Sequence, residues 1–359
     1  MLLVNSGISS IEGQIEEYAF SAFKEINPPS TQYNCTQLVN VYLNIIKEGL
    51  RQYPPNKIVS LAMEIASGLM PQKIYDDKNK NVLLINGQEI NMNILKILRD
   101  MGRKIITWQI DDPYLLDRSV DIGKICEHIF TVDSSALSFY RESGCKNAHW
   151  LPLAFPEKYR DVVYNANYSS DVCLIGTPFA GSKRVRIVDE LAATLASVKA
   201  RIIGSHVIAE SWQKNLKNYE MLKNKIIEAF MAPDEAVKYY KAAKININIH
   251  RDSYGYQMDM NNGKVVAKSP NDRVFIIAGL GGFQLVDDTR PDLGELFEIG
   301  KEIVTFQSIE DLKEKIIYYL GHEAEREKIA KAGQIRALKD HTYRNRVKKI
   351  LEVVGEDQN

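Results

Sequence analysis

Residues 269–288 read SPNDRVFIIAGLGGFQLVDD, and this stretch decides the fold because a helix start is followed closely by a buried strand. Ser269 can cap a helix, Pro270 suits its first position, and Asp272 falls in the first turn, where the helix dipole favours a carboxylate. After three glycines, the apolar run 283–286 is typical of a central strand in a parallel sheet. An ordinary helix-turn-strand unit is the open alternative to a ligand site.

The first amide groups of such a helix lack intrahelical partners, so they offer a binding site for a diphosphate. Ser269, Asn271 and Arg273 lie beside these amides, and a guanidinium matches phosphate oxygens well. A surface salt bridge is the structural alternative for Arg273. We predict that this segment binds a phosphate-bearing ligand.

Strand and helix patterns alternate along most of the chain, which predicts an α/β fold with parallel sheets. The strands are expected at 2–5, 82–86, 104–109, 129–133, 171–175, 200–203, 245–250, 283–286 and 302–306. The helices are expected at 11–26, 38–50, 91–101, 120–126, 135–143, 183–196 and across most of 309–354. The pattern leaves residues 58–70 open between strand and helix.

The proline-containing stretch 151–167 separates two α/β series. We therefore predict an N-terminal Rossmann-like domain over 1–155, a C-terminal one over 168–338, and a helix over 339–359 that packs back across the domains. Two doubly wound domains that face each other place the carboxyl ends of both sheets on one cleft, where ligands bind.

Composition excludes several classes of protein. Among 359 residues, 46 are basic and 46 acidic, so no net charge favours nucleic acid. No apolar run approaches the ~18 residues of a membrane span, and the N-terminus lacks a signal-peptide pattern. The four cysteines lie far apart and the six histidines form no helical pair, so we expect reduced thiols in a cytoplasmic protein without a metal.

Further donor-site candidates lie at predicted strand ends of the second series. Lys183 and Arg184 begin a helix and can add positive charge at a diphosphate, with a solvated helix end as the alternative. His250 lies beside Arg251 at a strand end, where a ligand contact and a structural role both remain open. Four glycines are interpreted as close-approach or turn positions of the donor site: Gly7, Gly176, Gly281 and Gly282.

On the other domain, Asp111 and Asp112 follow the predicted strand 104–109 and precede a proline. An inverting transfer needs a base for the acceptor hydroxyl, and an aspartate at this rim could serve. Capping of a turn by the Asp-Asp-Pro sequence is the alternative. Asp133 and Glu89 are further candidates for the base.

Several segments resemble the CgeB-like spore-maturation glycosyltransferases. They are WQIDDPYLLDRS (108–119), FTVDSSALSFYRESG (130–144), ININIHRD (245–252), SPNDRVFIIAGLGGFQLVDD (269–288), DLGELFEIGKEIVTF (292–306) and HTYRNR (341–346). The resemblance extends from about Val82 to the C-terminus. It implies a GT-B architecture in which the C-terminal domain holds the nucleotide-sugar donor and the N-terminal domain the acceptor, without a metal.

One position departs from the family pattern. Members commonly carry a glutamate directly after the helix phenylalanine, where it is expected to hold the donor ribose, whereas Phe275 is followed here by Ile276. An aliphatic side chain cannot accept those hydrogen bonds. Either a neighbouring group such as Gln284 replaces the glutamate, or the donor lies differently, or activity is reduced.

The sequence thus predicts a cytoplasmic glycosyltransferase that moves a sugar from a nucleotide-sugar donor, a UDP-sugar, to a protein or glycan acceptor. No cofactor, nucleic acid or membrane span is expected, and a homodimer is left open. Two alternatives remain: a GT-B-fold epimerase of nucleotide sugars, and a catalytically silent sugar- or nucleotide-binding protein or surface-layer assembly protein. Fold alone cannot separate them.

Overall fold

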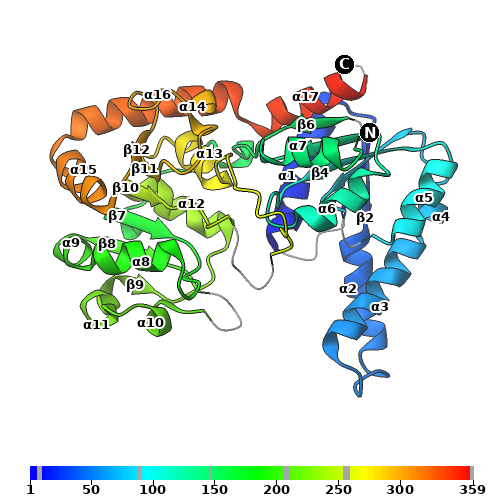
Figure 1. Cartoon of the computed structure of the whole chain (residues 1–359), viewed down its shortest axis with the longest axis horizontal. Helices are drawn as coiled ribbons and strands as arrows, with labels where there is room; N and C mark the ends of the chain where they lie inside the picture. The colour runs from blue at the N-terminus through cyan, green and yellow to red at the C-terminus, as the bar shows by residue number, and fades with distance from the viewer. Residues whose placement is uncertain (6–9, 88–89, 146, 206–209, 254–258, 356–359) are drawn as a thin grey trace. The chain divides into compact units, whose positions relative to one another are not determined.

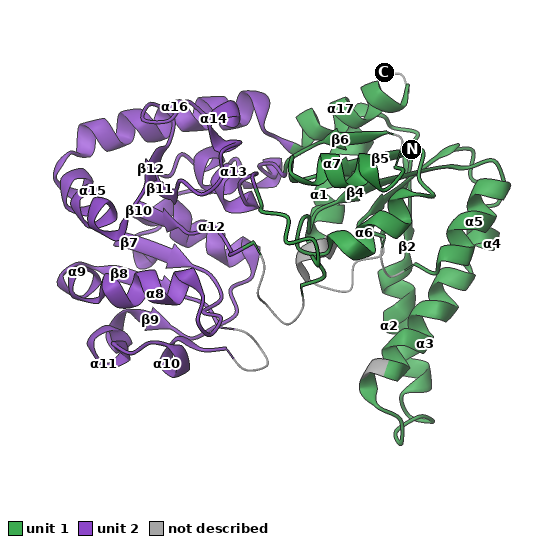
Figure 2. Ribbon diagram, viewed as in Figure 1, with its two compact units in different colours: residues 1–152, 253–267, 343–359 green, residues 153–252, 268–342 purple. Residues whose placement is uncertain are grey.

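The computed structural model describes residues 1–5, 10–87, 90–145, 147–205, 210–253 and 259–355. The chain divides into two compact units (Figure 2). Unit 1 comprises Met1–Pro152, Ser253–Ala267 and Tyr343–Asn359, and unit 2 comprises Leu153–Asp252 and Lys268–Thr342. Each unit contains one six-stranded sheet with helices on both faces (Figure 1), which confirms the predicted α/β class with two Rossmann-like units.

The sheet of unit 1 has the strand order β2-β1-β3-β4-β5-β6, and its neighbouring strands are parallel. Its strands are β1 (Leu2–Asn5), β2 (Thr31–Asn34), β3 (Asn81–Ile85), β4 (Lys104–Gln109), β5 (His128–Thr131) and β6 (Ala148–Trp150). Its helices are α1 (Ser10–Ile26), α2 (Cys35–Ile46), α3 (Pro55–Gly68), α4 (Met70–Lys73), α5 (Met92–Asp100), α6 (Leu116–Gly123), α7 (Ala136–Glu142) and α17 (Tyr343–Val354). The segment that the pattern left open between strand and helix is thus helix α3.

Alternation along the strands gives unit 1 two apolar faces. Leu2 and Val4 of β1 belong to a core cluster with residues of α2, α3 and α5, including Val39 and Leu95. On the other face, the Trp108 ring of β4 lies beside the Tyr343 ring of α17, and α17 packs on α1. Both faces are therefore closed by helices, as buried parallel strands require.

The last helix, α17, belongs to unit 1, although the residues that precede it belong to unit 2. The C-terminal helix was predicted to pack back in this way. Its Tyr343 ring lies 5.4 Å from the Tyr18 ring of α1 and 6.0 Å from the Trp108 ring, measured between centroids. The helix buries one stripe, which contains Val347 and Leu351, while charged residues cover its outer face. The amphipathic pattern of the C-terminus is therefore explained by packing on α1.

Leu351→Ala is expected to lower the free energy of unfolding by about 2–5 kcal/mol, because the fully buried side chain leaves a cavity between α17 and unit 1. Glu352→Ala, at an exposed neighbouring position, is the control and should change it by less than about 0.5 kcal/mol. Urea unfolding of both variants measures the difference. Equal stability of the two variants would contradict the assigned packing of α17.

Unit 2 has the strand order β12-β11-β10-β7-β8-β9, again with parallel neighbours. Its strands are β7 (Ser170–Ile175), β8 (Ala200–Ile203), β9 (Ile226–Ile227), β10 (Ala243–Asn248), β11 (Gln284–Asp287) and β12 (Val304–Phe306). Its helices are α8 (Lys183–Glu190), α9 (Ala192–Ser197), α10 (Trp212–Asn215), α11 (Tyr219–Leu222), α12 (Pro233–Ala242), α13 (Asp272–Gly279), α14 (Leu293–Leu296), α15 (Ile309–Gly321) and α16 (Glu323–Asp340). If β7 to β12 are renumbered 1 to 6, the sheet reads 3-2-1-4-5-6 from the β9 edge to the β12 edge. This is the strand order of dinucleotide-binding folds.

The two faces of the unit 2 sheet differ in polarity. Ile245 and Ile247 of β10 join an apolar cluster with α8, α9 and α15. On the face toward α13, the same strand presents Asn246 and Asn248, both buried. The sequence ININI is therefore a strand with one apolar face and one amide face, and the amide face underlies the candidate site.

The segment Ser253–Ala267 leaves unit 2 and packs in unit 1. Met260 forms two backbone hydrogen bonds there, donating to the Tyr114 carbonyl (2.8 Å) and accepting from the Asp117 amide (2.9 Å). Val265 packs against the core cluster that contains Tyr140. The alternation of strands and helices gave no indication of this exchange, because the described residues of the segment, 253 and 259–267, form neither a strand nor a helix.

Candidate functional site

The strand order of unit 2 reverses between β7 and β10, which pair with each other but continue toward opposite edges of the sheet. In open α/β sheets, ligands bind at the carboxyl ends of the strands at such a switch point. The side chains that follow β7, β10 and β11 and those that begin α8 and α13 meet at this edge. We take this edge of unit 2 as the candidate site.

Helix α13 begins two residues later than expected, at Asp272. Its cap is Asn271, whose side-chain oxygen accepts from the Val274 amide (3.3 Å), and not Ser269. The Ser269 hydroxyl instead donates to Asp292 at 2.5 Å, in a buried contact. The prediction of Ser269 as cap and Pro270 as first helical residue was therefore wrong, because asparagine caps as well as serine and the serine is held elsewhere.

The Asn271 cap is fixed by the end of β10. The Asn271 and Asn248 side-chain amides pair reciprocally, with N to O distances of 3.0 and 3.1 Å. This pairing orients the cap oxygen toward Val274 and ties the start of α13 to the sheet. The free amide groups of the first helical turn therefore lie at the switch point in a defined position.

Two arginines join the ends of β7 and β10. The Arg273 guanidinium donates to the carbonyls of Ile175 (2.6 Å) and Ile249 (3.0 Å). The Arg184 guanidinium donates to the carbonyls of Thr177 (2.5 Å) and Ile249 (3.2 Å). Arg184 is thus not a solvated helix end, and these contacts of Arg273 are not a surface salt bridge. Two positive charges share one carbonyl acceptor at the switch point.

Glycines make room for this arrangement. A Cβ at Gly176 would lie 2.7 Å from Nε of Arg184, and a Cβ at Gly204, which has φ 145°, would lie 2.3 Å from the Gly176 carbonyl oxygen. Gly176 is therefore a close-approach position, as expected, although the group that approaches it in this structure is Arg184. Gly204 was not singled out from the sequence.

Gly204→Ala is expected to destabilise the chain by at least about 2 kcal/mol, because the added methyl overlaps a backbone oxygen and the φ angle disfavours alanine. Gly294→Ala is the matched control, since a Cβ there would meet no atom within 4 Å. Thermal unfolding of both variants tests this, and an unchanged Gly204→Ala protein would be inconsistent with the loop geometry.

Lys183, Asp287 and His250 form a charged cluster at the same edge. Asp287 Oδ1 lies 3.2 Å from Lys183 Nζ, and Asp287 Oδ2 lies 3.2 Å from His250 Nδ1 and accepts from the His250 amide at 2.5 Å. Burial lowers the pKa of His250 to about 4, so the imidazole is neutral near pH 7. Burial alone would raise the pKa of Asp287, but His250 and Lys183 hold it well below its usual range.

The remaining strand-end candidate, Arg251, is half-buried, and its carbonyl accepts from the buried Arg290 at 2.5 Å. At the start of α8, the Lys183 amide donates to the carboxylate of Asp252 at 3.1 Å. The start of α8 therefore binds an acidic group supplied by the chain itself, which agrees with the expected preference of a helix start for anions.

Three donor-site candidates lie away from this edge and are corrected. Gly281 and Gly282 follow α13 and precede β11, so they lie at the amino edge of the sheet, where a Cβ at Gly281 would meet Gln334. Gln284 is buried beneath α13, where its side-chain amide donates to the Val274 carbonyl at 3.0 Å. Helix α13 runs antiparallel to the strands, so it begins at the carboxyl edge of the sheet and ends at the amino edge. The two glycines follow its end and therefore lie far from the amides of its first turn. Gly7, the fourth glycine, lies outside the described residues.

In unit 1, Asp111 and Asp112 follow β4 and differ in their surroundings. Asp112 is buried and accepts from the Tyr140 hydroxyl at 2.6 Å, and burial raises the pKa of Asp112 to about 7. Asp111 is half-buried and accepts from the Asn86 side-chain amide at 2.6 Å. A catalytic base must be able to contact its substrate. The buried Asp112 carboxyl cannot do so, whereas the half-buried Asp111 carboxylate is accessible from solvent.

The other base candidates are less suitable. Asp133 is buried, and its carboxylate accepts from the amide and the hydroxyl of Ser135 at 3.0 and 2.6 Å, which is a capping role. Glu89 lies outside the described residues. Across the described ranges, no group of three metal-ligating side chains could hold a metal ion, and no helix is long and apolar enough to cross a membrane.

Two comparisons of the sequence agree with this geometry. Residues 183–352, which begin at α8 and include α13, match the family described as glycosyl transferase-like. The spore protein CgeB of Bacillus subtilis (strain 168) is 27% identical over 265 residues, which cover 73% of this chain and 78% of CgeB. Over these residues the chain is similar to CgeB and to the glycosyl transferase-like family.

Solved structures confirm the GT-B fold of this CgeB-like chain. HepE from Anabaena in complex with UDP and glucose matches with a TM-score of 0.65 at 13% identity, over 99% of this chain and 98% of HepE. A candidate UDP-N-acetylglucosamine 2-epimerase from Listeria monocytogenes matches with a TM-score of 0.55 at 12% identity, over 100% of this chain and 97% of that protein. At such identities the likeness concerns the fold alone.

The structure also places Ile276, the departure from the family pattern. It lies in the second turn of α13 and is 9% exposed, so it is a nearly buried apolar side chain close to the candidate edge. Gln284 does not replace the expected glutamate there, because its amide is held under the helix. The CgeB-like chain therefore presents an aliphatic residue at this position.

Sequence reasoning missed three residues that build the site: Asn248, Asp287 and Gly204. The alternation in ININI held the signal for Asn248, because an amide at the last position of a strand faces the ligand edge. Asp287 is the last residue of β11, and the sequence pattern indicated only that the strand ends near it. Gly204 carried no signal, since its close neighbour, Gly176, is 28 positions away in sequence.

Proposed function

We propose that this chain transfers a sugar from a nucleotide-sugar donor, a UDP-sugar, to a protein or glycan acceptor. The observation that supports this most strongly is the convergence of the start of α13 and the Arg184, Arg273 and Lys183 side chains on the switch point of unit 2. The complexes of HepE with UDP and with UDP-glucose support the choice of donor. The name of CgeB supports a role in spore maturation.

In this proposal the diphosphate lies against the start of α13. The free amides of the first turn and the helix dipole favour its charge. The Arg273 guanidinium keeps N–H groups beyond the two that hold backbone carbonyls, and a departing diphosphate would accept from them. We further propose that these positive side chains stabilise the leaving group without a metal.

His250 contributes as a neutral hydrogen-bonding group in this account. Its low pKa keeps it uncharged from about pH 5 upward, so it would not neutralise phosphate charge. Its Nδ1 lies 3.2 Å from the Asp287 carboxylate, whereas Nε2 has no hydrogen-bond partner among the residues that the structure describes. A donor sugar hydroxyl could supply one. On the acceptor side, Asp111 is the proposed base.

The setting of the reaction is also proposed. All four cysteines are free thiols and three of them are buried, which suits the reducing cytoplasm, where nucleotide sugars are made. We leave the sugar, the stereochemistry and a homodimer to experiment.

Incubation with UDP-sugars alone separates the three candidate activities. A transferase is expected to bind the donor, release UDP slowly into water, and release it faster when acceptor is added. The Listeria neighbour motivates the epimerase alternative, which would convert the sugar without releasing UDP. Ile276 motivates the silent alternative, which would bind without turnover. Anion-exchange chromatography resolves UDP from the sugar nucleotides. If neither binding nor turnover occurs with any nucleotide sugar, the proposal fails.

A further inference from the structure

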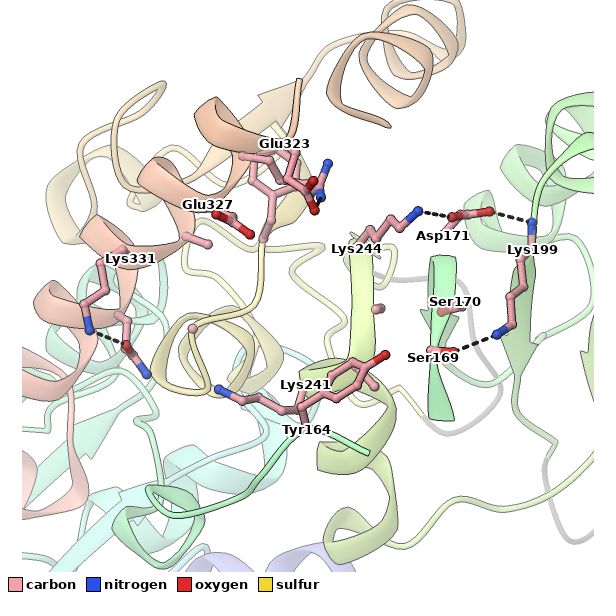
Figure 3. A pocket seen from close by; sticks show the side chains of 17 residues that line it. Tyr164, Ser169, Ser170, Asp171, Lys199, Lys241, Lys244, Glu323, Glu327 and Lys331 are labelled. Carbon is pink, nitrogen blue, oxygen red and sulfur yellow. Dashed lines mark hydrogen bonds and ion pairs between the residues drawn. The ribbon is translucent and has the colours of Figure 1, made fainter. Parts of the chain in front are cut away.

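A pocket of unit 2 lies at the edge of the sheet opposite the proposed donor site. It has a volume of about 670 Å³, and the amino ends of β7 and β10, the loop before β11, the end of α12 and the first half of α16 line it (Figure 3). This volume is in the range of small-molecule sites. The donor proposal uses none of its residues.

The charged side chains around this pocket carry excess positive charge. Five basic residues line it against three acidic ones. Lys244 pairs with Asp171 at 2.8 Å, and Arg326, itself only 5% exposed, pairs with Glu323 at 3.3 Å. These pairs leave two positive charges in excess after Glu327 is counted.

Lys199, Lys241 and Lys331 are the basic lining residues outside these two pairs, and the Lys199 ammonium donates to the Ser169 hydroxyl at 2.6 Å. Lys241 Nζ donates to the Leu280 carbonyl at 2.7 Å, and Lys331 Nζ donates to the side-chain oxygen of Gln334 at 3.1 Å. Both acceptors are neutral, and in the described part of the chain no carboxylate lies within ion-pair distance of either ammonium. Burial and the nearby Lys331 charge lower the pKa of Lys241, so the two ammonium groups are close enough to repel each other.

The opposite wall of the pocket offers neutral hydrogen-bonding groups. Ser170 is 3% exposed, and within the described ranges its hydroxyl has no partner. Beside it lies the Asp171 carboxylate with Lys244, while Lys241 and Lys331 occupy the other side (Figure 3). The Tyr164 ring adds an apolar surface. An anion on one side and a hydroxylated body on the other would complement these walls.

A structural explanation accounts for part of this arrangement. Lysines near helix carboxyl ends are favourable, and Lys241 contacts the carbonyl that follows α13. That explanation does not cover Lys331, which lies in the middle of α16, or the buried hydroxyl of Ser170 without a partner. A bound anion between the two lysines would account for both ammonium groups.

We propose that this pocket is a second ligand site, which binds a small phosphorylated metabolite of the sugar-phosphate class. The phosphate lies between Lys241 and Lys331, and hydroxyl groups of the sugar reach Ser170 and the Asp171 and Lys244 pair. The site lies at the amino edge of the sheet and does not depend on the proposed transferase activity.

Calorimetric titration of the full chain with glucose 6-phosphate tests the site. Lys241→Gln with Lys331→Gln is expected to weaken binding at least about ten-fold, since two charge-assisted hydrogen bonds are lost. Lys328→Gln, at an exposed position of the same helix, is the matched control and should leave the affinity unchanged. Lys183→Ala, at the carboxyl edge, should also leave it unchanged, which separates this site from the donor site.

Three outcomes would overturn the proposal: no binding of any sugar phosphate to the unaltered chain, equal binding by the double variant, or loss of binding in Lys183→Ala alone. Inorganic phosphate is titrated in parallel, and an affinity equal to that of the sugar phosphate would refute the assigned role of the sugar. If the double variant does not fold, Lys331→Glu replaces it, because that side chain is exposed and charge reversal should abolish binding.

Discussion

Replacing Arg273 by alanine is expected to weaken UDP binding by about ten- to a hundred-fold, the loss that one or two charge-assisted hydrogen bonds would cause. The Arg273 guanidinium lies at the start of α13 and joins the ends of β7 and β10 through the Ile175 and Ile249 carbonyls. Its removal takes away a positive charge at the switch point and loosens the strand ends. Both effects act against a bound diphosphate.

Arg186→Ala is the matched control for this experiment. Arg186 is exposed on α8, two residues from Arg184, so its loss removes one positive charge from the same unit without touching the switch point. Calorimetric titration with UDP gives both affinities, and thermal unfolding shows whether each variant is folded. If Arg273→Ala is unstable, Arg273→Lys retains the charge without the paired geometry and should still bind UDP more weakly. Equal affinities in Arg273→Ala and Arg186→Ala would count against the donor assignment.

Asp112→Asn is expected to change the pH dependence of stability by up to about 4 kcal/mol. The pKa of Asp112 rises from the ordinary 3.8 to about 7 in the fold, a difference of about 3 units at 1.36 kcal/mol each. Because the folded state keeps the proton that the unfolded state loses, stability falls as pH rises from about 4 to about 7 and is constant above that range. Asparagine cannot ionise, so this loss disappears in the variant.

Urea unfolding at pH 4.5, 6 and 8 gives the free energy of unfolding of the variant and of the unaltered chain. The contributions of other titrating groups cancel in the difference between the two. The variant should gain relative stability with each step upward in pH. Asp121→Asn, at an exposed position on α6, should show no such trend. Tyr140→Phe should move the transition to higher pH, because the Tyr140 hydroxyl stabilises the ionised carboxyl. A pH-independent difference for Asp112→Asn would show that the carboxyl is not buried as described.

The sequence alone predicted most of the fold, because buried parallel strands are short apolar runs that helical patterns separate. The expected strands at 104–109 and 200–203 coincide with β4 and β8. The edge strands β2, β6 and β9 were not predicted, since TQYN is polar and AHW and II are only three and two residues long. The return of residues 253–267 to unit 1 depends on backbone contacts with Tyr114 and Asp117, which no periodicity records.

The candidate site was predicted in its position but only partly in its chemistry. Lys183, Asn271 and Arg273 lie where a helix start at a strand end places them. The actual partners of these residues could not be predicted, because they come from elsewhere in the sequence: Asp287 for Lys183, Asn248 for Asn271 and the Ile175 carbonyl for Arg273. The glycines at 281 and 282 were misplaced because the pattern does not tell which edge of the sheet a turn serves.

A crystal structure of the chain with UDP tests the central claim most directly. We expect the diphosphate at the carboxyl edge of the unit 2 sheet, with its oxygens on the first amides of α13 and on the Arg273 guanidinium, and the uridine beside the ends of β10 and β11. UDP bound at any other surface of the chain, or no bound UDP at millimolar concentration, would contradict the account.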